Sequence, residues 1–304
     1  MEYNSLIELM DAFPDEASCV RHLEALRWPL GIICPLCGES GEFSRIKSRN
    51  LYKCADCGKQ FSVRKGTIFE ESRLPLRKWF AAAWLVTSHR KGIPSTQLAR
   101  ELGVTQKTAW FMLGRLREVT DAMNERGLPL FGEVEADETY LGGKERNKHS
   151  SKRLRQGGGT SGKAPVAGVR ERGGQVRLQT VEAATQQELH AFIGANVADG
   201  ATLYTDEHRG YVGMGDAYRH LAVRHGVGEY VNGQAHTNGI ESFWALLKRG
   251  YIGTFHHITW KHLHRYLAEF EARFNMGDLT GSQRVDRVLA SAAGRRLTYA
   301  ELVA

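Results

Sequence analysis

Three acidic residues in well-separated stretches of the sequence are the leading candidates for chemistry. Asp137 lies in the acidic segment 133–138, Asp206 follows a short apolar run, and Glu241 lies near the start of an amphipathic stretch. Carboxylate oxygens are the ligands that Mg²⁺ and Mn²⁺ prefer. A pair of such ions can activate an attacking oxygen and stabilise a leaving oxygen in phosphodiester chemistry. If the three acids converge at one sheet edge, the sequence predicts a divalent-metal site for that chemistry.

The stretch around Glu241 predicts the helix that would carry the third acid. Apolar residues recur at helical spacing from Ile240 onward and form one stripe. Glu241 and Lys248 are two turns apart, so both would lie at the border of that stripe and face the same site. The other interpretation is a capping box, in which Asn238 and Glu241 satisfy the backbone at the helix start.

The acids need strands to bring them together. The acidic segment 132–143 has the pattern of a strand, which a solvated edge strand would also explain. Two further runs joined at Gly173-Gly174 predict a hairpin, and a short run before Asp206 predicts another strand. The predicted strands are residues 166–169, 176–181 and 202–205. Residues 185–188 match a capping box that would open a helix.

Four of the five cysteines form two CxxC pairs, Cys34 with Cys37 and Cys54 with Cys57. Their spacing is typical of a zinc site with four thiolates, and the glycine after each pair permits the tight turn. Because no ligand position is left open, we expect structural Zn²⁺ in a zinc ribbon. Redox-active thiol pairs are the alternative. We expect Cys19 to be a buried structural thiol.

Residues 95–110 predict two helices that meet at Gly103, with Thr105 capping the second. This pattern is typical of a helix-turn-helix, although plain helical bundles also contain it. The side chains that would face DNA are Gln106, Lys107, Thr108 and Phe111.

The chain has 304 residues, 42% of them hydrophobic, so it has room for two or three domains with a sizeable core. Its net charge of +7 does not by itself require a polyanionic partner. The glycine-rich loop 142–163 concentrates positive charge and could fold onto a nucleic-acid backbone, or be merely solvated. Its basic residues are Lys144, Arg146, Lys148, Lys152, Arg153 and Arg155.

We expect an α/β protein with five segments. They are N-terminal helices (1–30), a zinc ribbon (31–72), a helix-turn-helix region (73–125), a catalytic domain (131–280) and a helical tail (281–304). The sequence shows neither a secretory signal nor an apolar run long enough to cross a bilayer, so we expect no membrane partner.

Three motifs resemble those of DDE-type bacterial insertion-sequence transposases, in the ISXO-like group with an N-terminal zinc ribbon and an RNase H-like catalytic core. The motifs are Ala136–Lys144, Thr205–Tyr211, and His236–Arg249 continuing to Gly253–His257. The ribbon and the segment after it also match, so the resemblance covers nearly the whole chain.

This resemblance implies that Asp137, Asp206 and Glu241 form the metal-binding triad. It also implies that Lys248, beside Arg249, contacts DNA near the reacting phosphate. The implied reaction is hydrolysis at the ends of the mobile element, after which the 3′-hydroxyls attack target DNA. Joining two ends implies at least a homodimer on DNA, and we expect a cytoplasmic, nucleoid-associated protein.

Alternatives remain for the third ligand, for two histidines and for the function. Some members of this group have asparagine as the third residue, which makes Asn238 the alternative to Glu241. His236 and His208 would orient ligands or DNA, or would be packing residues. The alternative functions are a non-catalytic DNA-binding regulator and a structure-specific nuclease on the same core.

Overall fold

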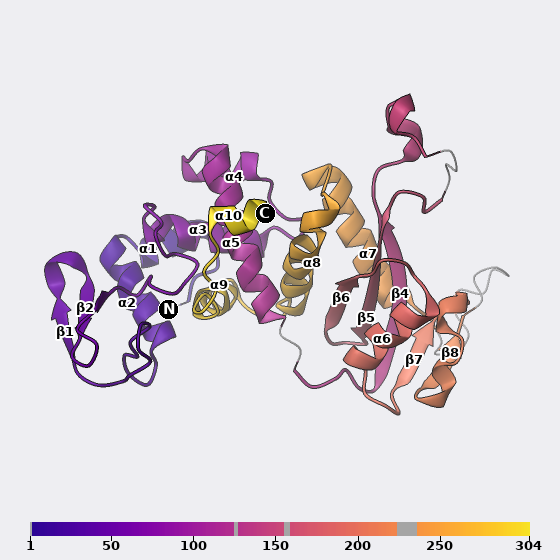
Figure 1. The fold of residues 1–304 in the computed structure, drawn as a ribbon, viewed down its shortest axis with the longest axis horizontal. Helices are drawn as coiled ribbons and strands as arrows, with labels where there is room; N and C mark the ends of the chain where they lie inside the picture. Colours follow the sequence, from indigo (N-terminus) through magenta and orange to yellow (C-terminus); the bar gives the residue numbers. More distant parts are fainter. Residues whose placement is uncertain (1, 125–126, 155–158, 224–235) are drawn as a thin grey trace. The chain divides into compact units, whose positions relative to one another are not determined.

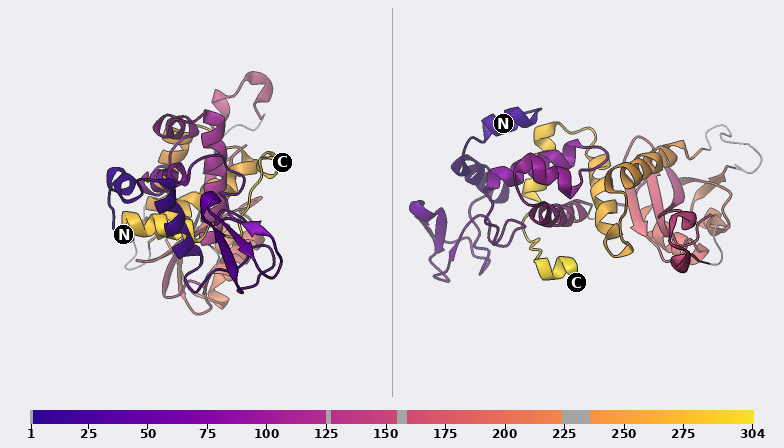
Figure 2. Two further views of the ribbon diagram at one scale, coloured as in Figure 1. Left: turned by 90° about the vertical axis from the view of Figure 1, so that its left-hand side faces the viewer. Right: turned by 90° about the horizontal axis from the view of Figure 1, so that it is seen from above.

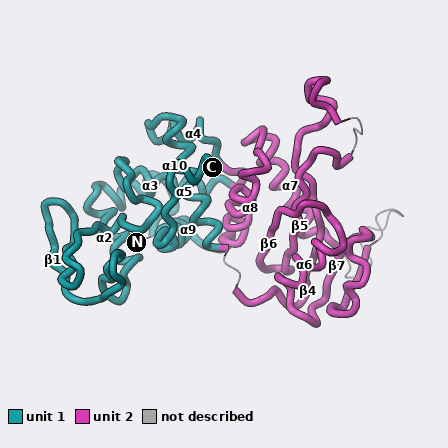
Figure 3. Tube along the Cα trace, viewed as in Figure 1, with its two compact units in different colours: residues 1–89, 93–123, 278–304 teal, residues 90–92, 124–277 magenta. Residues whose placement is uncertain are grey.

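The computed structural model describes residues 2–124, 127–154, 159–223 and 236–304, and these form two compact units (Figure 3). The first unit comprises residues 1–89, 93–123 and 278–304, and the second comprises residues 90–92 and 124–277. The predicted N-terminal helices, ribbon, helix-turn-helix region and tail thus share one unit, and the predicted catalytic segment forms most of the other.

The first unit is mainly helical. One core joins buried side chains of the first two helices with those of α3, α5 and α9. Thr105 Oγ1 accepts a hydrogen bond from the N–H of Thr108 at 3.2 Å, which confirms the predicted cap of α5. The helices are α1 (Leu6–Ala12), α2 (Glu16–Arg27), α3 (Leu76–Ser88), α4 (Ser95–Leu102), α5 (Gln106–Met123), α9 (Gly281–Ala290) and α10 (Tyr299–Val303).

The ribbon in this unit is a small antiparallel sheet of β1 (Phe43–Ile46), β2 (Leu51–Cys54) and β3 (Gln60–Phe61). The 3-10 turn η1 (Lys47–Arg49) joins its first two strands. The rings of Tyr52 and Phe61 stack at 5.8 Å, and Trp28 of the preceding segment packs edge-on against both. This aromatic cluster supplies the core of the ribbon.

The second unit is built on a mixed sheet with strand order β6-β5-β4-β7-β8 (Figure 1). β4, β5 and β6 are antiparallel neighbours, whereas β7 is parallel to β4 and β8 is parallel to β7. Because β4 lies inside the sheet, the edge-strand interpretation of the acidic segment is wrong. The predicted mixed sheet is confirmed. The strands are β4 (Glu133–Leu141), β5 (Ala164–Glu171), β6 (Val176–Thr180), β7 (Thr202–Thr205) and β8 (Arg219–Ala222).

Helices cover both faces of this sheet (Figures 1 and 2). On one face α6 (Gln186–Asn196) packs against Val134 and Ala136, and on the other α7 (Asn238–Gly250) and α8 (Trp260–Asn275) pack near Leu141. Among the described residues, none of the helices is long and apolar enough to cross a membrane. The short turns are η2 (Glu145–Asn147), η3 (Ser150–Lys152), η4 (Arg209–Tyr211), η5 (Met214–Asp216) and the π-helical η7 (Tyr251–Phe255).

The capping box predicted at the start of α6 is only half correct. The side chain of Thr185 accepts a hydrogen bond from the N–H of Glu188, as predicted. The carboxylate of Glu188 instead accepts from the N–H groups of Glu182 and Ala183, at 2.8 and 3.2 Å. This acid therefore orders the loop before the helix.

Candidate active site

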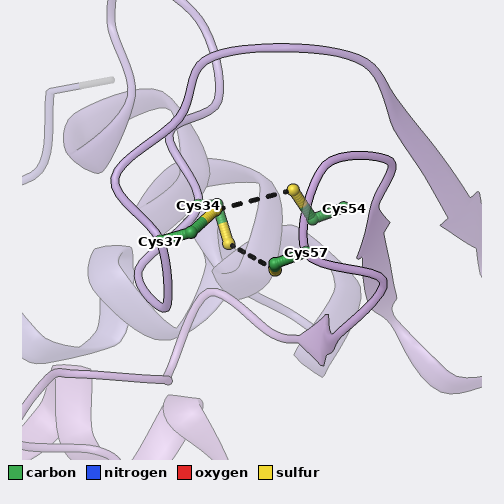
Figure 4. A group of neighbouring side chains, drawn as sticks. All are labelled: Cys34, Cys37, Cys54 and Cys57. Carbon is green, nitrogen blue, oxygen red and sulfur yellow. Dashed lines mark hydrogen bonds between the residues drawn. The ribbon is translucent and has the colours of Figure 1, made fainter.

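The four cysteines of the two CxxC pairs form one cluster in the first unit (Figure 4). Their sulfurs all lie within 4.8 Å of one another, with 3.8 Å between Cys34 and Cys57 and between Cys37 and Cys54. Sulfurs arranged tetrahedrally at about 2.3 Å from Zn²⁺ would be about 3.8 Å apart. The cluster therefore fits structural zinc, as the sequence predicted.

The glycine after each pair makes the expected turn. Gly38 and Gly58 have φ angles of +84° and +67°, which favour glycine. Each donates its N–H to the carbonyl of the first cysteine of its pair, at 2.9 and 3.0 Å. These turns aim both sulfurs of a pair at the same point.

In the second unit, Asp137 is held on β4 between two donors. The indole N–H of Trp244 donates to Oδ2 at 3.0 Å, and the N–H of Glu138 donates to Oδ1 at 2.8 Å. Burial, and then the negative charges of Glu138 and Asp206, raise the pKa of Asp137 from 3.8 to about 8. Both donors favour the charged form, so the rise shows that burial and the neighbouring negative charges outweigh these hydrogen bonds.

Asp206 follows the last residue of β7, on the strand next to β4. Its Oδ1 accepts the N–H of His208 at 2.9 Å.

Glu138 points to the α6 side of the sheet, where Tyr211 donates its hydroxyl to Oε2 at 2.7 Å. Burial is the main reason that the pKa of Glu138 is raised above its ordinary value. Asp137, Glu138 and Asp206 therefore influence one another's charge at this point of the sheet, with Glu138 on the face opposite Asp137, and we call the three residues the acidic centre.

Glu241 lies on α7 but turns toward the start of its own helix. It is exposed, and its Oε1 accepts the hydroxyl of Thr237 at 2.7 Å. Among the described residues, only the cysteines form a group of metal-ligand atoms that all lie within 4.8 Å. The negative charges of Glu138 and Asp206 thus act on Asp137, whereas Glu241 is directed toward Thr237. Lys248 and Arg249 are exposed further along α7.

The predicted cap by Asn238 is wrong. Asn238 is the first residue of α7, and Thr237 occupies the N-cap position without a side-chain bond to the backbone. The N–H of Ile240 donates instead to the carboxylate of Glu135, a buried acid on β4, at 2.8 Å. The cap comes from a residue far away in the sequence.

The two candidate histidines both lie beside acids. His236 Nδ1 lies 3.4 Å from Glu135 Oε1, at the entrance to α7. His208 Nδ1 lies 3.7 Å from Glu138 Oε1 and accepts the N–H of Gly210 at 3.2 Å. Both positions fit side chains that orient acidic groups.

The predicted DNA-facing residues of α5 lie at its start. Gln106 and Lys107 are exposed, and Thr108 is half-buried. The ring of Tyr299 on α10 lies 4.9 Å from the Lys107 ammonium and 5.9 Å from the Phe111 ring. The C-terminal helix therefore covers part of the face that was predicted to meet DNA.

The basic loop between β4 and β5 has internal order within its described part. Arg153 donates to the carbonyl groups of Arg146 and Lys148, at 2.7 and 2.9 Å. Glu145 pairs with Lys148 and accepts the N–H of Leu154. Lys144, Arg146 and Lys152 are exposed, whereas Arg155 lies outside the described residues.

The sequence interpretation missed four side chains at the acidic centre: Glu135, Glu138, Trp244 and Tyr211. Alternation along the strand would have placed Glu135 on the same face as Asp137 and Glu138 on the opposite face. The sequence carries no signal for the contacts from Trp244 and Tyr211, since both look like ordinary core residues.

Comparison with known proteins places the chain in a family. Residues 129–275 match the ISXO2-like transposase domain, and residues 14–60 match the transposase zinc-ribbon domain. A protein of Halobacterium salinarum, described as an uncharacterized protein in transposable element ISH50, is 31% identical over 293 residues. That match covers 92% of this chain and 98% of the relative.

Two solved structures show weaker likeness. The Mos1 strand transfer complex is 11% identical, with 70% of this chain and 78% of that chain covered and a TM-score of 0.26. The Mos1 transposase paired-end complex with left transposon end is also 11% identical, with coverages of 72% and 80% and a TM-score of 0.26. At such TM-scores these likenesses support no conclusion about the chain. The domain matches and the long alignment with the ISH50 protein suffice: the chain belongs to the ISXO2-like DDE transposases that carry an N-terminal zinc ribbon.

Proposed function

We propose that this transposase cuts the ends of its insertion sequence and joins the freed 3′-hydroxyls to target DNA. Asp137, Asp206 and Glu241 would hold Mg²⁺ or Mn²⁺ for both reactions. When bound, the ions would activate the attacking oxygen and stabilise the leaving oxygen at phosphorus. Both steps are in-line displacements, so one set of ligands serves cutting and joining.

The observation that carries this proposal is the acidic centre at Asp137. Half-buried carboxylates beside one another are costly without a counter-ion, and the pKa of Asp137 at about 8 expresses that cost. A divalent cation would remove it. The donors are oxygens, which suit Mg²⁺ and Mn²⁺ better than softer metals.

Glu241 would complete the site by leaving Thr237. A hydrogen bond to a neutral hydroxyl is typically worth about 1 kcal/mol, so this bond by itself would not hold the carboxylate against a cation beside Asp137 and Asp206. Asn238 is exposed one turn earlier and is the alternative third ligand. An amide oxygen would bind the cation more weakly than a carboxylate.

DNA would contact exposed basic residues around this centre. Lys248 and Arg249 extend from α7, and Lys144, Arg146 and Lys152 are exposed on the loop after β4. Positive side chains near phosphates release counter-ions and give salt-dependent affinity. Arg153 would instead order the loop, because its guanidinium donates to the backbone carbonyls of Arg146 and Lys148.

Two DNA-binding elements would lie in the first unit. The zinc ribbon would use Zn²⁺ as a structural ion, and α5 would present Gln106, Lys107 and Thr108 to the terminal repeats. Because two element ends must be joined, the working form would be a homodimer or a larger oligomer on DNA.

The test is cleavage and joining of a labelled duplex that carries the element's terminal sequence. We expect Mg²⁺- or Mn²⁺-dependent 3′-end cleavage and strand transfer by the wild type, and losses of more than 100-fold in Asp137→Ala and Asp206→Asn. Glu182→Gln, an exposed acid outside the centre, is the control. Full activity of Asp137→Ala would refute the assignment, and cleavage without joining would indicate a nuclease.

The same assay decides the third ligand. If Glu241 binds the cation, Glu241→Gln loses activity while Asn238→Ala retains most of it. The reverse order would assign the role to Asn238.

A further inference from the structure

Glu135 is a buried acid on β4 that contacts the start of helix α7. It lies two residues before Asp137 on β4, so both side chains project from the same face of the sheet. The side chain of Glu135 is only 2% exposed. A buried acid persists only where it is paired and hydrogen-bonded, so its partners indicate its role.

One oxygen of Glu135 caps α7. Oε2 accepts the N–H of Ile240 at 2.8 Å, in the first turn of the helix. The first N–H groups of a helix have no partners within it, and Thr237 at the N-cap position makes no side-chain bond to the backbone. A carboxylate at this end also interacts favourably with the helix dipole. β4 therefore supplies a cap that α7 does not provide for itself.

The other oxygen secures the chain that enters α7. Oε1 accepts from Arg172 Nε at 3.0 Å, and Arg172 Nη2 donates to the carbonyl oxygen of His236 at 2.9 Å. The Arg172 guanidinium also lies 3.9 Å from the ring centroid of Tyr204 on β7. Arg172 thus links Glu135, the entrance of α7 and the strand that leads to Asp206.

Gly239 provides the space for this arrangement. A Cβ at this position would lie 2.6 Å from Glu135 Oε2 and 2.5 Å from Arg170 Nη1. Contacts this short would force the carboxylate away from the helix start. The glycine therefore leaves the space that the side chains of Glu135 and Arg170 occupy at the start of α7.

We propose that Glu135 is a positioning residue that, with Arg172 and Gly239, docks the start of α7 on β4 and so sets Glu241 and Lys248 relative to Asp137. This inference rests on the proposed function only for its consequence at the metal, because the docking itself does not involve an ion. Residues that orient ligands typically contribute about 10- to 100-fold to metal affinity.

The first experiment measures the docking without metal. Amide hydrogen exchange of residues 240–247 is followed in the full chain for wild type, Glu135→Ala and Glu188→Ala. Glu188 is the matched control, because it also accepts two backbone N–H groups but beside α6. We expect at least tenfold faster exchange at the start of α7 in Glu135→Ala only. Unchanged exchange there would overturn the proposal.

The second experiment measures the consequence, by calorimetric titration with Mn²⁺ alone. We expect Glu135→Ala to bind Mn²⁺ about 10- to 100-fold more weakly, with Glu188→Ala within about twofold of wild type. Glu135→Gln should recover part of the affinity, since its amide oxygen can still accept from Ile240. Wild-type affinity in a folded Glu135→Ala would contradict a positioning role.

Two further results separate a failure of the docking proposal from misfolding of the variant and from a failure of the proposed function. If Glu135→Ala does not fold, Gly239→Ala provides the second variant, and it should likewise accelerate exchange at the start of α7. If the wild type binds no Mn²⁺, the proposed function fails while the exchange experiment still decides the docking.

Discussion

The indole N–H of Trp244 donates to Asp137 Oδ2 at 3.0 Å, which joins α7 directly to the acidic centre on β4. Trp244 is almost completely buried among apolar side chains of the same face. One side chain therefore contributes both to the packing of α7 and to the orientation of Asp137. Together with the contact between Glu135 and Ile240, it attaches α7 to β4 at two successive helical turns.

Replacing Trp244 by phenylalanine should separate these two roles. The smaller phenyl ring would retain much of the apolar packing but donate no hydrogen bond, so Asp137 would lose one of its two donors. We expect Trp244→Phe to remain folded and to bind Mn²⁺ about tenfold more weakly in a calorimetric titration. Trp260→Phe, at an exposed position of α8, is the control and should leave the affinity unchanged. Equal affinities for both variants would contradict this role.

Gly168 on β5 leaves room for the same indole. It is the strand partner of Asp137, and a Cβ there would lie 2.5 Å from Trp244 Cη2. We expect Gly168→Ala to lower the free energy of unfolding by about 1–3 kcal/mol, measured by urea denaturation, because the indole must shift. Gly194→Ala is the opposite case, since this glycine of α6 has open space around its Cβ position. It should stabilise the protein by up to about 1 kcal/mol. Similar effects at both glycines would be inconsistent with the close contact.

The stability of the metal-free protein should depend on pH through Asp137. Its folded-state pKa, at about 8, lies above the ordinary value of 3.8, so protonation favours the folded state. That contribution is complete below about pH 4 and is lost as the pH rises through about 8. Asp137→Asn should therefore raise the melting temperature of the metal-free protein most clearly at about pH 9. Asp216→Asn, at an exposed acid, serves as the control. A melting temperature that falls in Asp137→Asn at this pH would refute the sign.

Zinc should be retained by the four clustered cysteines and not by Cys19. Cys57→Ser removes one ligand, so we expect its zinc content to fall from about one ion per chain to near zero, with loss of ribbon structure. Cys19 is fully buried in α2, and Cys19→Ala should retain zinc although it loses some packing. Metal analysis after gel filtration measures both. Full zinc content in Cys57→Ser would exclude the four-thiolate site.

Patterns that depend on neighbouring residues were predicted well from the sequence. The strand at residues 202–205 and the hairpin across Gly173-Gly174 follow from short apolar runs bounded by turn residues. The cap by Thr105 and the two CxxC turns follow equally from local spacing. Such features are determined by propensity and backbone geometry within a few residues.

Contacts between distant residues were not predictable in this way. The cap of α7 comes from Glu135, which is 105 residues before Ile240 in the sequence, so the local pattern suggested Asn238 instead. Glu188 similarly binds the loop before its helix in place of its own N-cap residue. The sequence pattern identifies a carboxylate near a helix start, whereas tertiary packing decides which backbone groups it reaches.

We expect Asp137, Asp206 and Glu241 to bind the same divalent ions. Replacing Mg²⁺ by Fe²⁺ with ascorbate generates radicals that cleave the backbone next to the bound metal, and mass spectrometry locates the cuts. We predict cuts in β4 near Asp137, after β7 near Asp206, and in the first turns of α7 near Glu241, all suppressed by excess Mg²⁺. Cuts near the first two acids without any in α7 would contradict a site that includes Glu241.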